Sequence, residues 1–198
     1  MPNLFCRPLA AIVLVASAIA PAQAATAPQT FLEQGLQEII KIAESNRGAT
    51  PVQLARKTRP ALERLFNFES LTKRAIGGGW RDLNPAQQKQ AISLFSEMLI
   101  RSYAARFDWD AKLEMQLSPP VDVGSGRIEI PAQTRYAGSK ANVLYRLENT
   151  AGRWSVYDVV IEGVSMTANY RAQFDSIRQR SGGEGLLKLM KDTLDKGS

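Results

Sequence analysis

The chain has 198 residues, with 25 Lys and Arg against 19 Asp and Glu, a single Cys and no His. Its length is enough for one domain with a sizeable core, and 44% hydrophobic with 22% charged residues excludes wholesale disorder. Because histidine is missing, the chain cannot hold a Ser-His-Asp or Cys-His catalytic group, a histidine general base or a histidine metal ligand.

The first 24 residues have the pattern of a cleavable signal peptide. Arg7 precedes the apolar run 9–20, which is shorter than the roughly 20 residues that a bilayer span needs. Ala22 and Ala24 then supply the small residues of a cleavage site, and an uncleaved anchor is the alternative interpretation. We therefore expect export of one domain, residues 25–198, without Cys6 and hence without thiol or disulfide chemistry.

Removal of Arg7 leaves 24 basic against 19 acidic side chains, a net charge of +5. For an exported protein, anionic lipid headgroups or acidic protein surfaces are better candidate partners than nucleic acid. The charges are spread along the chain, so the basicity alone indicates no particular site.

Helical periodicity fills the N-terminal half of the exported chain. We expect helices over about 31–43, 50–66, 69–76 and 85–107. The second and fourth begin with strong start signals, Thr50-Pro51-Val52-Gln53 and Asn84-Pro85-Ala86-Gln87, which combine an N-cap, a proline and a capping-box glutamine. Pro60 is expected to interrupt or restart the second helix.

The period changes to two residues from about Lys112. Alternating segments predict strands over 113–117, 127–136, 143–147 and 154–161. The last strand is apolar on both faces, with Trp154, Val156 and Val160 expected opposite Tyr157, Val159 and Ile161. Helices over 165–180 and 184–196 follow, divided at Gly182 and Gly183. The fold class is therefore α+β: N-terminal helices, a twisted antiparallel sheet of about four strands, and C-terminal helices.

Several residue patterns suggest chemistry, and each has a stronger structural interpretation. Ser70 and Lys73 match the S-x-x-K of serine acyl-enzymes without its companion motifs, and the run 77–79 is better read as a helix cap than as a phosphate loop. The two carboxylates in 108–110 are weak evidence for a metal site, and a polar loop is the better interpretation. Asp158 lies within an apolar strand, where we favour a paired structural carboxylate over a catalytic acid or base.

The segment 154–166, Trp-Ser-Val-Tyr-Asp-Val-Val-Ile-Glu-Gly-Val-Ser-Met, is similar to the signature of the MlaC family. The segments 169–174 and 182–187 also resemble its C-terminal pattern, as do the helix start at 84–88 and Tyr103 near the end of that helix. The family consists of periplasmic phospholipid carriers of the maintenance-of-lipid-asymmetry pathway, and is also called the toluene-tolerance auxiliary family.

The resemblance implies a carrier in the Gram-negative periplasm that holds the acyl tails of a glycerophospholipid in an apolar cavity between sheet and helices. It implies transfer between an outer-membrane lipoprotein–porin complex and an inner-membrane ABC transporter complex with an MCE-domain subunit, which maintains outer-membrane lipid asymmetry. It further implies a monomer without catalytic residues, metal, cofactor or nucleic-acid partner, whose bound phospholipid is cargo.

By alternation, the residues expected to contact the tails lie on the long helix and on the inner face of the sheet. They are Phe95, Met98, Leu99, Tyr103, Ile128, Ile130, Val143, Tyr145, Leu147, Val156, Val160 and Val164. Gly163 is expected to turn the chain with positive φ, and Ser165 to cap the following helix. We expect helix 85–107 and the C-terminal helices to separate from the sheet and admit the tails.

Two other hypotheses remain open from the sequence. One is a hydrolase or isomerase on a cone-like α+β scaffold, using Asp158 or Tyr157 as acid–base groups on a hydrophobic substrate. The other is a periplasmic interaction module with a filled core.

Overall fold

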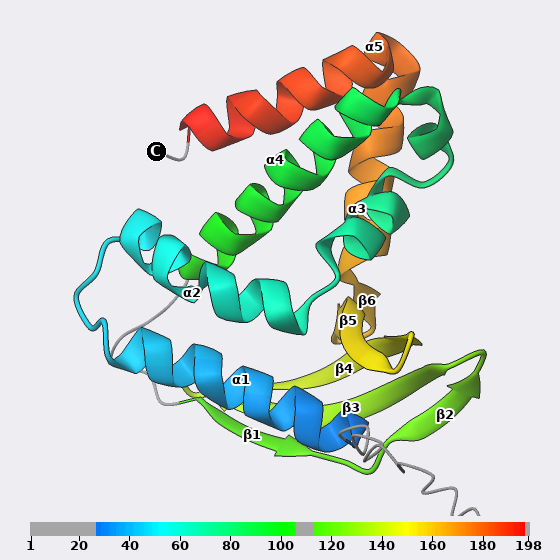
Figure 1. Cartoon of the computed structure of the whole chain (residues 1–198). Helices are drawn as coiled ribbons and strands as arrows, with labels where there is room; N and C mark the ends of the chain where they lie inside the picture. Colours follow the sequence, from blue (N-terminus) through cyan, green and yellow to red (C-terminus); the bar gives the residue numbers. More distant parts are fainter. Residues whose placement is uncertain (1–26, 106–112, 197–198) are drawn as a thin grey trace, which may run out of the picture.

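The computed structural model describes residues 27–105 and 113–196, so the predicted signal peptide and the carboxylates at 108–110 lie outside the described residues. The chain forms the expected α+β fold, with helices before and after an antiparallel sheet (Figure 1). No helix within these described ranges is both long enough and apolar enough to cross a membrane.

The helices before the sheet follow the sequence signals closely. They are α1 (Pro28–Glu44), α2 (Pro51–Leu65), α3 (Phe68–Ile76), the 3-10 turn η1 (Gly77–Asp82) and α4 (Pro85–Ala104). Both predicted capping boxes form: Thr50 pairs reciprocally with Gln53 at the start of α2, and Asn84 with Gln87 at the start of α4. The expected break at Pro60 is wrong, because α2 continues through it. Pro60 is exposed, so water can satisfy the carbonyl group that its missing N–H leaves without a donor.

The sheet has six strands rather than about four. They are β1 (Glu114–Leu117), β2 (Val121–Gly124), β3 (Arg127–Tyr136), β4 (Ser139–Thr150), β5 (Arg153–Ile161) and β6 (Val164–Ser165). The order is β1-β3-β4-β5-β6, and β2 pairs with the start of β3. The two strands that were not expected are short: β2 has four residues, all exposed, and β6 has two, so neither is long enough for a clear alternating pattern.

The last helix, α5 (Met166–Lys196), is bent at Gly182, whose φ of 64° and ψ of −167° are not helical. This divides it into two helices, as the sequence indicated. The first half packs beside α3 and the second half returns along α4 (Figure 1). The predicted turn and cap before α5 are also confirmed, since Gly163 has a φ of +78° and the Ser165 hydroxyl accepts from the Ala168 amide at 3.1 Å.

The buried apolar side chains form two separate clusters. We call the first the helical core; it joins α3, η1, α4 and α5 around Phe95, Phe174 and Met190. We call the second the sheet core; it lies between the inner face of the sheet and α1, around Leu32, Ile130 and Leu147. In Figure 1, α1 lies across the sheet and the helical core stands away from it, with α2 between. The two cores meet along a seam.

Candidate functional site

An apolar pocket of about 250 Å³ lies in this seam. Every lining side chain is aliphatic, aromatic or a methionine, and the set includes members of both cores. The lining residues are Leu36, Ile39, Leu62, Phe66, Phe68, Leu71, Leu99, Ile100, Tyr103, Val143, Tyr145, Val159, Ile161 and Met166. Such a lining can hold hydrocarbon and offers almost no hydrogen bonds.

A β-bulge decides which residues of β5 face the pocket. Arg146 pairs with Asp158 whereas Leu147 pairs with Val156, so Tyr157 is an extra residue in β5. An extra residue reverses the alternation beyond it. The predicted faces of this strand are therefore wrong after Val156: Val159 joins Val156 on the inner face.

Ile161 lies on that inner face too, and both it and Val159 line the pocket. Val160 instead pairs with Leu144 on the other face. Both faces of β5 are buried over residues 156–160, as the apolar sequence predicted, but the bulge exchanges the residues that lie on each face beyond Val156.

Two tyrosine hydroxyl groups are the polar atoms at the pocket, and both face sulfur. The Tyr145 hydroxyl donates to Met115 Sδ at 3.8 Å, and the Tyr103 hydroxyl to Met166 Sδ at 3.4 Å. Burial, with a smaller electrostatic contribution from Tyr103, raises the pKa of Tyr145 to about 12. Tyr145 is therefore neutral at physiological pH, and the described lining has no group that could act as a general base there.

The twelve residues predicted to contact acyl tails separate into three groups. Those that line the pocket are Leu99, Tyr103, Val143 and Tyr145. Those within or against the two cores are Phe95, Met98, Ile128, Ile130, Leu147 and Val156. Those placed elsewhere are Val160 and Val164, the latter 59% exposed on β6. Contact with a bound ligand stays a prediction for all twelve.

Most of the pocket wall was missed because it comes from elements whose packing the sequence does not reveal. Leu36 and Ile39 belong to the apolar stripe of α1, which indicates a buried face without naming its neighbour. Phe66 and Phe68 flank the short link between α2 and α3, with ring centroids 6.1 Å apart. Phe66 packs against both cores, so it lies at the centre of the seam.

Asp158 has the structural role that the sequence favoured. Its carboxylate is 2% exposed and accepts from Arg146 Nη1 at 3.2 Å, the Ser165 hydroxyl at 2.7 Å and the Thr167 amide at 3.1 Å. These bonds attach β5 to β6 and to the first turn of α5. A buried carboxylate with this many donors is fully engaged in holding the fold.

Tyr157 lies away from the apolar pocket. The Arg74 guanidinium is 4.0 Å from the centre of its ring, and that of Arg127 is 5.7 Å away. Neither Tyr157 nor Asp158 lines the pocket, so these two residues do not face a hydrophobic substrate placed there.

The glycine run 77–79 ends α3 and lets two arginines of α5 approach. Gly77 is the C-cap with a φ of 62°, as the sequence indicated, and a Cβ there would lie 2.8 Å from Arg171 Nε. A Cβ at Gly79 would collide with Arg178. Arg171 donates two hydrogen bonds to the Arg74 carbonyl at 2.9 and 2.7 Å, and Arg178 pairs with Asp82 at 3.1 Å. The glycine run therefore has a structural role: it leaves room for α5 to pack closely against the end of α3.

The other candidate sites have no catalytic arrangement. Lys73 pairs with Glu69 at 2.5 Å and lies over the Trp80 ring, so the S-x-x-K lysine is held on its own helix. In the part of the chain that the structure describes, no three His, Cys, Asp or Glu side chains gather where they could hold a metal ion.

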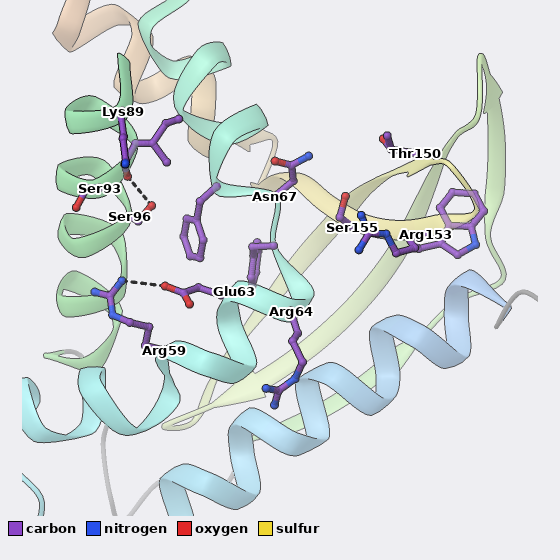
Figure 2. A pocket seen from close by; sticks show the side chains of 14 residues that line it. Arg59, Glu63, Arg64, Asn67, Lys89, Ser93, Ser96, Thr150, Arg153 and Ser155 are labelled. Carbon is purple, nitrogen blue, oxygen red and sulfur yellow. Dashed lines mark hydrogen bonds and ion pairs between the residues drawn. The ribbon is translucent and has the colours of Figure 1, made fainter. Parts of the chain in front are cut away.

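A second, polar cleft of about 680 Å³ adjoins the apolar pocket (Figure 2). It lies between α2, α4 and the turn from β4 to β5, and it shares Phe66 and Phe68 with the apolar pocket. Four basic side chains and one acidic one line it: Arg59, Arg64, Lys89, Arg153 and Glu63.

Comparison with known proteins gives one family and two relatives. Residues 32–192 match the model of the family described as MlaC protein. A Haemophilus influenzae protein described as the intermembrane phospholipid transport system binding protein MlaC is 23% identical over 193 residues, 93% of this chain and 88% of its own length. The fold is similar to that of a solved phospholipid-binding protein from Ralstonia solanacearum in complex with a phospholipid. For that structure the TM-score is 0.78 at 21% identity, and 86% of this chain and 98% of the other are covered.

Proposed function

Because the chain belongs to the MlaC protein family, we propose that it binds a phospholipid by its acyl tails in the apolar pocket and carries it as cargo. The observation that carries this proposal is the pocket itself, a cavity lined by apolar side chains at the seam of two cores. The names of the two relatives, one a phospholipid transport protein and one a phospholipid-binding protein, support the same ligand class.

We further propose that the protein works in the periplasm as a monomeric shuttle. Its partners would be an outer-membrane lipoprotein–porin complex and an inner-membrane MCE-domain ABC transporter complex, and its work would maintain lipid asymmetry. The signal-peptide pattern of residues 1–24 supports export, and the word "intermembrane" in the name of the Haemophilus protein supports transport between two membranes.

The energetics of hydrocarbon favour a carrier that docks on a partner to release its lipid. Two tails with about 30 methylenes at about 0.8 kcal/mol each would cost on the order of 24 kcal/mol to expose to water. Non-covalent affinities saturate at roughly 18–21 kcal/mol. Release into bulk water is therefore negligible, and the lipid has to pass to a docked partner.

The pocket has to enlarge before it can hold such a ligand. A cavity of about 150 Å³ accommodates benzene, with six carbons. On that scale the 250 Å³ pocket holds about ten carbons, far fewer than two acyl tails contain. The described conformation is therefore a contracted one, and loading requires part of the wall to move.

The contacts across the seam favour a hinge at one end and an opening at the other. At one end, the Asn67 amide donates to the Val156 carbonyl at 2.9 Å, its side chain donates to Glu148 at 3.2 Å, and Arg74 stacks on Tyr157. At the other end, Tyr103 and Ile161 both line the apolar pocket and both are exposed. We propose that the helical core swings about the Asn67 end and about the first turn of α5, which Asp158 bonds to β5, so that α4 and the later part of α5 move away from the sheet.

We propose no catalytic role for this protein. Asp158 accepts three hydrogen bonds and the Tyr157 ring lies close to the guanidinium groups of Arg74 and Arg127, so the two groups of the enzyme hypothesis are occupied away from the pocket. A cavity at the seam is also more than an interaction module with a filled core needs.

Native mass spectrometry of the protein purified from a lipid-replete host tests the proposed function. We expect the unmodified protein to retain a stoichiometric phospholipid. Ile161→Lys places a charge on the pocket wall at a residue that is 40% exposed, so the variant should fold and lose most of its lipid. Val52→Lys is the matched control, because Val52 is 45% exposed on α2 and does not line the pocket. Absence of lipid from the unmodified protein, or equal occupancy of both variants, would contradict the proposal.

A further inference from the structure

Met115 on the edge strand β1 lies where solvent comes close to the sheet core. Its side chain is half-buried and lines two surface crevices, one of about 400 Å³ between α1 and β1 and one of about 570 Å³ along β1, β3 and β4. Polar side chains border both, among them Glu33 in the first crevice and Gln133 in the second. A small water-soluble molecule can therefore reach Met115 while the protein is folded.

The sulfur atom of Met115 also faces a buried hydroxyl group. The Tyr145 hydroxyl donates to Met115 Sδ at 3.8 Å across β3, where the small Ala132 lies on the inner face of the sheet. A thioether sulfur is a weak acceptor, whereas buried hydroxyl groups usually have a strong one. The arrangement therefore joins an accessible sulfur atom to a hydrogen-bond donor that is poorly satisfied.

The composition of the chain makes methionine the main target for an oxidant. Residues 25–198 contain no cysteine, so thioether sulfur is the group that peroxide oxidises most readily. Of the methionines that the structure describes, Met190 is fully buried and Met166 is 9% exposed, so both are shielded. Met98 is half-buried like Met115, but it packs against the helical core and accepts no hydrogen bond from any described residue. Met115 alone among them is both accessible and paired with a hydroxyl group.

We propose that Met115 is an oxidation site that takes an oxygen atom from a two-electron oxidant such as hydrogen peroxide, and that Tyr145 binds the resulting sulfoxide. The sulfur lone pair attacks one peroxide oxygen and the O–O bond breaks, so sulfur loses two electrons and the peroxide gains them. The proton of the attacked oxygen moves to the departing hydroxide, which leaves as water. The side chain of methionine has three rotatable bonds, so the new polar oxygen can turn to the Tyr145 hydroxyl and accept its hydrogen bond.

This pairing makes the oxidation of Met115 mild for the fold. A sulfoxide ordinarily disrupts an apolar core, because its oxygen is polar. At Met115 the lost apolar contact is offset by a strong hydrogen bond from β4 to the edge strand β1, which pairs along its length with β3. Met115 therefore removes oxidant with little loss of stability.

A cycle of oxidation and substitution tests the proposal. The exported protein is prepared with Met98→Leu, which removes the other half-buried methionine, and is compared with the same protein carrying Tyr145→Phe. Each protein is treated with hydrogen peroxide while folded, and peptide mass spectrometry locates the added oxygen. Unfolding by denaturant is followed before and after the treatment. The control carries Met98→Leu and Met115→Leu, which removes the sulfur atom and nearly conserves the volume of the side chain.

We expect the oxygen to be added at Met115 before Met166 and Met190. With Tyr145 present, oxidation should change the unfolding equilibrium constant by less than about threefold, and with Tyr145→Phe by about tenfold more, which corresponds to the loss of one buried hydrogen bond. The control should show neither change. An equal effect of oxidation with and without the Tyr145 hydroxyl would overturn the pairing, and the absence of oxygen at Met115 would overturn the oxidation site.

A second measurement decides the pairing even if the Tyr145→Phe protein does not fold. The carbon-13 resonance of Tyr145 Cζ reports the hydrogen bond that its hydroxyl group makes. Peroxide treatment should shift this resonance in the Met98→Leu protein and leave it in place in the control that lacks Met115. A resonance that does not move although Met115 carries the oxygen would overturn the proposal.

Discussion

The helical core and the sheet core are built by different means. The helical core combines aromatic contacts with polar bonds between its helices. The ring of Phe95 packs edge-on against Tyr170 and Phe174. Beside the glycine run 77–79, Arg171 of α5 donates to the Arg74 carbonyl and Arg178 pairs with Asp82. The sheet core relies on strand pairing along β3, β4 and β5 with α1 laid over the inner face. Each core is therefore cohesive within itself.

The seam between the cores lacks that cohesion over much of its length. Hydrogen bonds from Asn67 and the arginine–tyrosine stack join the cores at one end, and Asp158 holds the first turn of α5 to β5, whereas the apolar pocket lies between α4 and the sheet. A cavity leaves the atoms around it without partners and so weakens the contact between the two parts. The molecule can therefore open between its cores without unfolding either of them.

The largest effect is expected within the helical core. Phe95→Ala removes a fully buried ring with two edge-on partners and should lower the free energy of unfolding by about 3–5 kcal/mol. Because Phe95 does not line the pocket, the folded fraction should still take up lipid. Denaturant unfolding and lipid counting on the same sample measure both; Phe95→Leu is the milder control. A loss below about 1 kcal/mol would mean that the helical core is not tightly packed.

The sheet core is expected to make the protein less stable to unfolding at alkaline pH. The pKa of Tyr145 is about 12 in the folded protein, whereas an unfolded chain titrates near its ordinary value of 10. Above pH 10 the unfolded chain releases this proton and the folded chain retains it, so stability is complete below pH 10 and falls as the pH rises to 12.

Over that interval the loss attributable to Tyr145 should be about 3 kcal/mol. The measurement is the difference in unfolding free energy between the protein and Tyr145→Phe as a function of pH, since the other tyrosines and lysines titrate in both. A difference that stays constant from pH 9 to 12 would show that the hydroxyl group is not desolvated.

A smaller effect is expected where β5 joins α5. Asp158→Asn keeps the shape of the side chain but removes its charge from Arg146 and weakens the bond from the Ser165 hydroxyl, which should cost about 2 kcal/mol. Lipid binding should persist, because Asp158 lies outside the pocket. Glu129→Gln, which removes the other carboxylate bonded to Arg146, is the control and should cost less at its more exposed position. Loss of a catalysed reaction on Asp158→Asn would contradict the structural role.

Local signals explain which parts of the fold the sequence could predict. The capping residues at Thr50 and Asn84 act within one helical turn, so the sequence contains the whole interaction. The alternation in β3 likewise reports a face that is buried at Ile128, Ile130 and Ala132. By contrast, the bulge at Tyr157 has no signature in an apolar strand, and it reversed the predicted faces of Val159 and Val160.

The site was harder to predict because a pocket is a property of the seam. An apolar stripe indicates that a face is buried, and it does so equally for Phe95 within a packed core and for Leu99 at a cavity. The wall formed by Phe66 and Phe68 depends on the angle between α2 and α3, and the polar cleft is lined by Lys89 and Arg153, which are 64 residues apart in the chain. These relations belong to tertiary packing alone.

The distance between the two cores is the most direct measure of opening at the seam. Spin labels at Ala105 and Gln133, both exposed, report the separation of the end of α4 from the sheet in residues 25–198, which contain no native cysteine. Labels at Gln90 and Lys191 report a distance within the helical assembly of α4 and α5. On loading with phospholipid, the first distance should increase and the second should stay unchanged. Lipid-loaded protein in which the first distance stays unchanged would contradict opening at the seam.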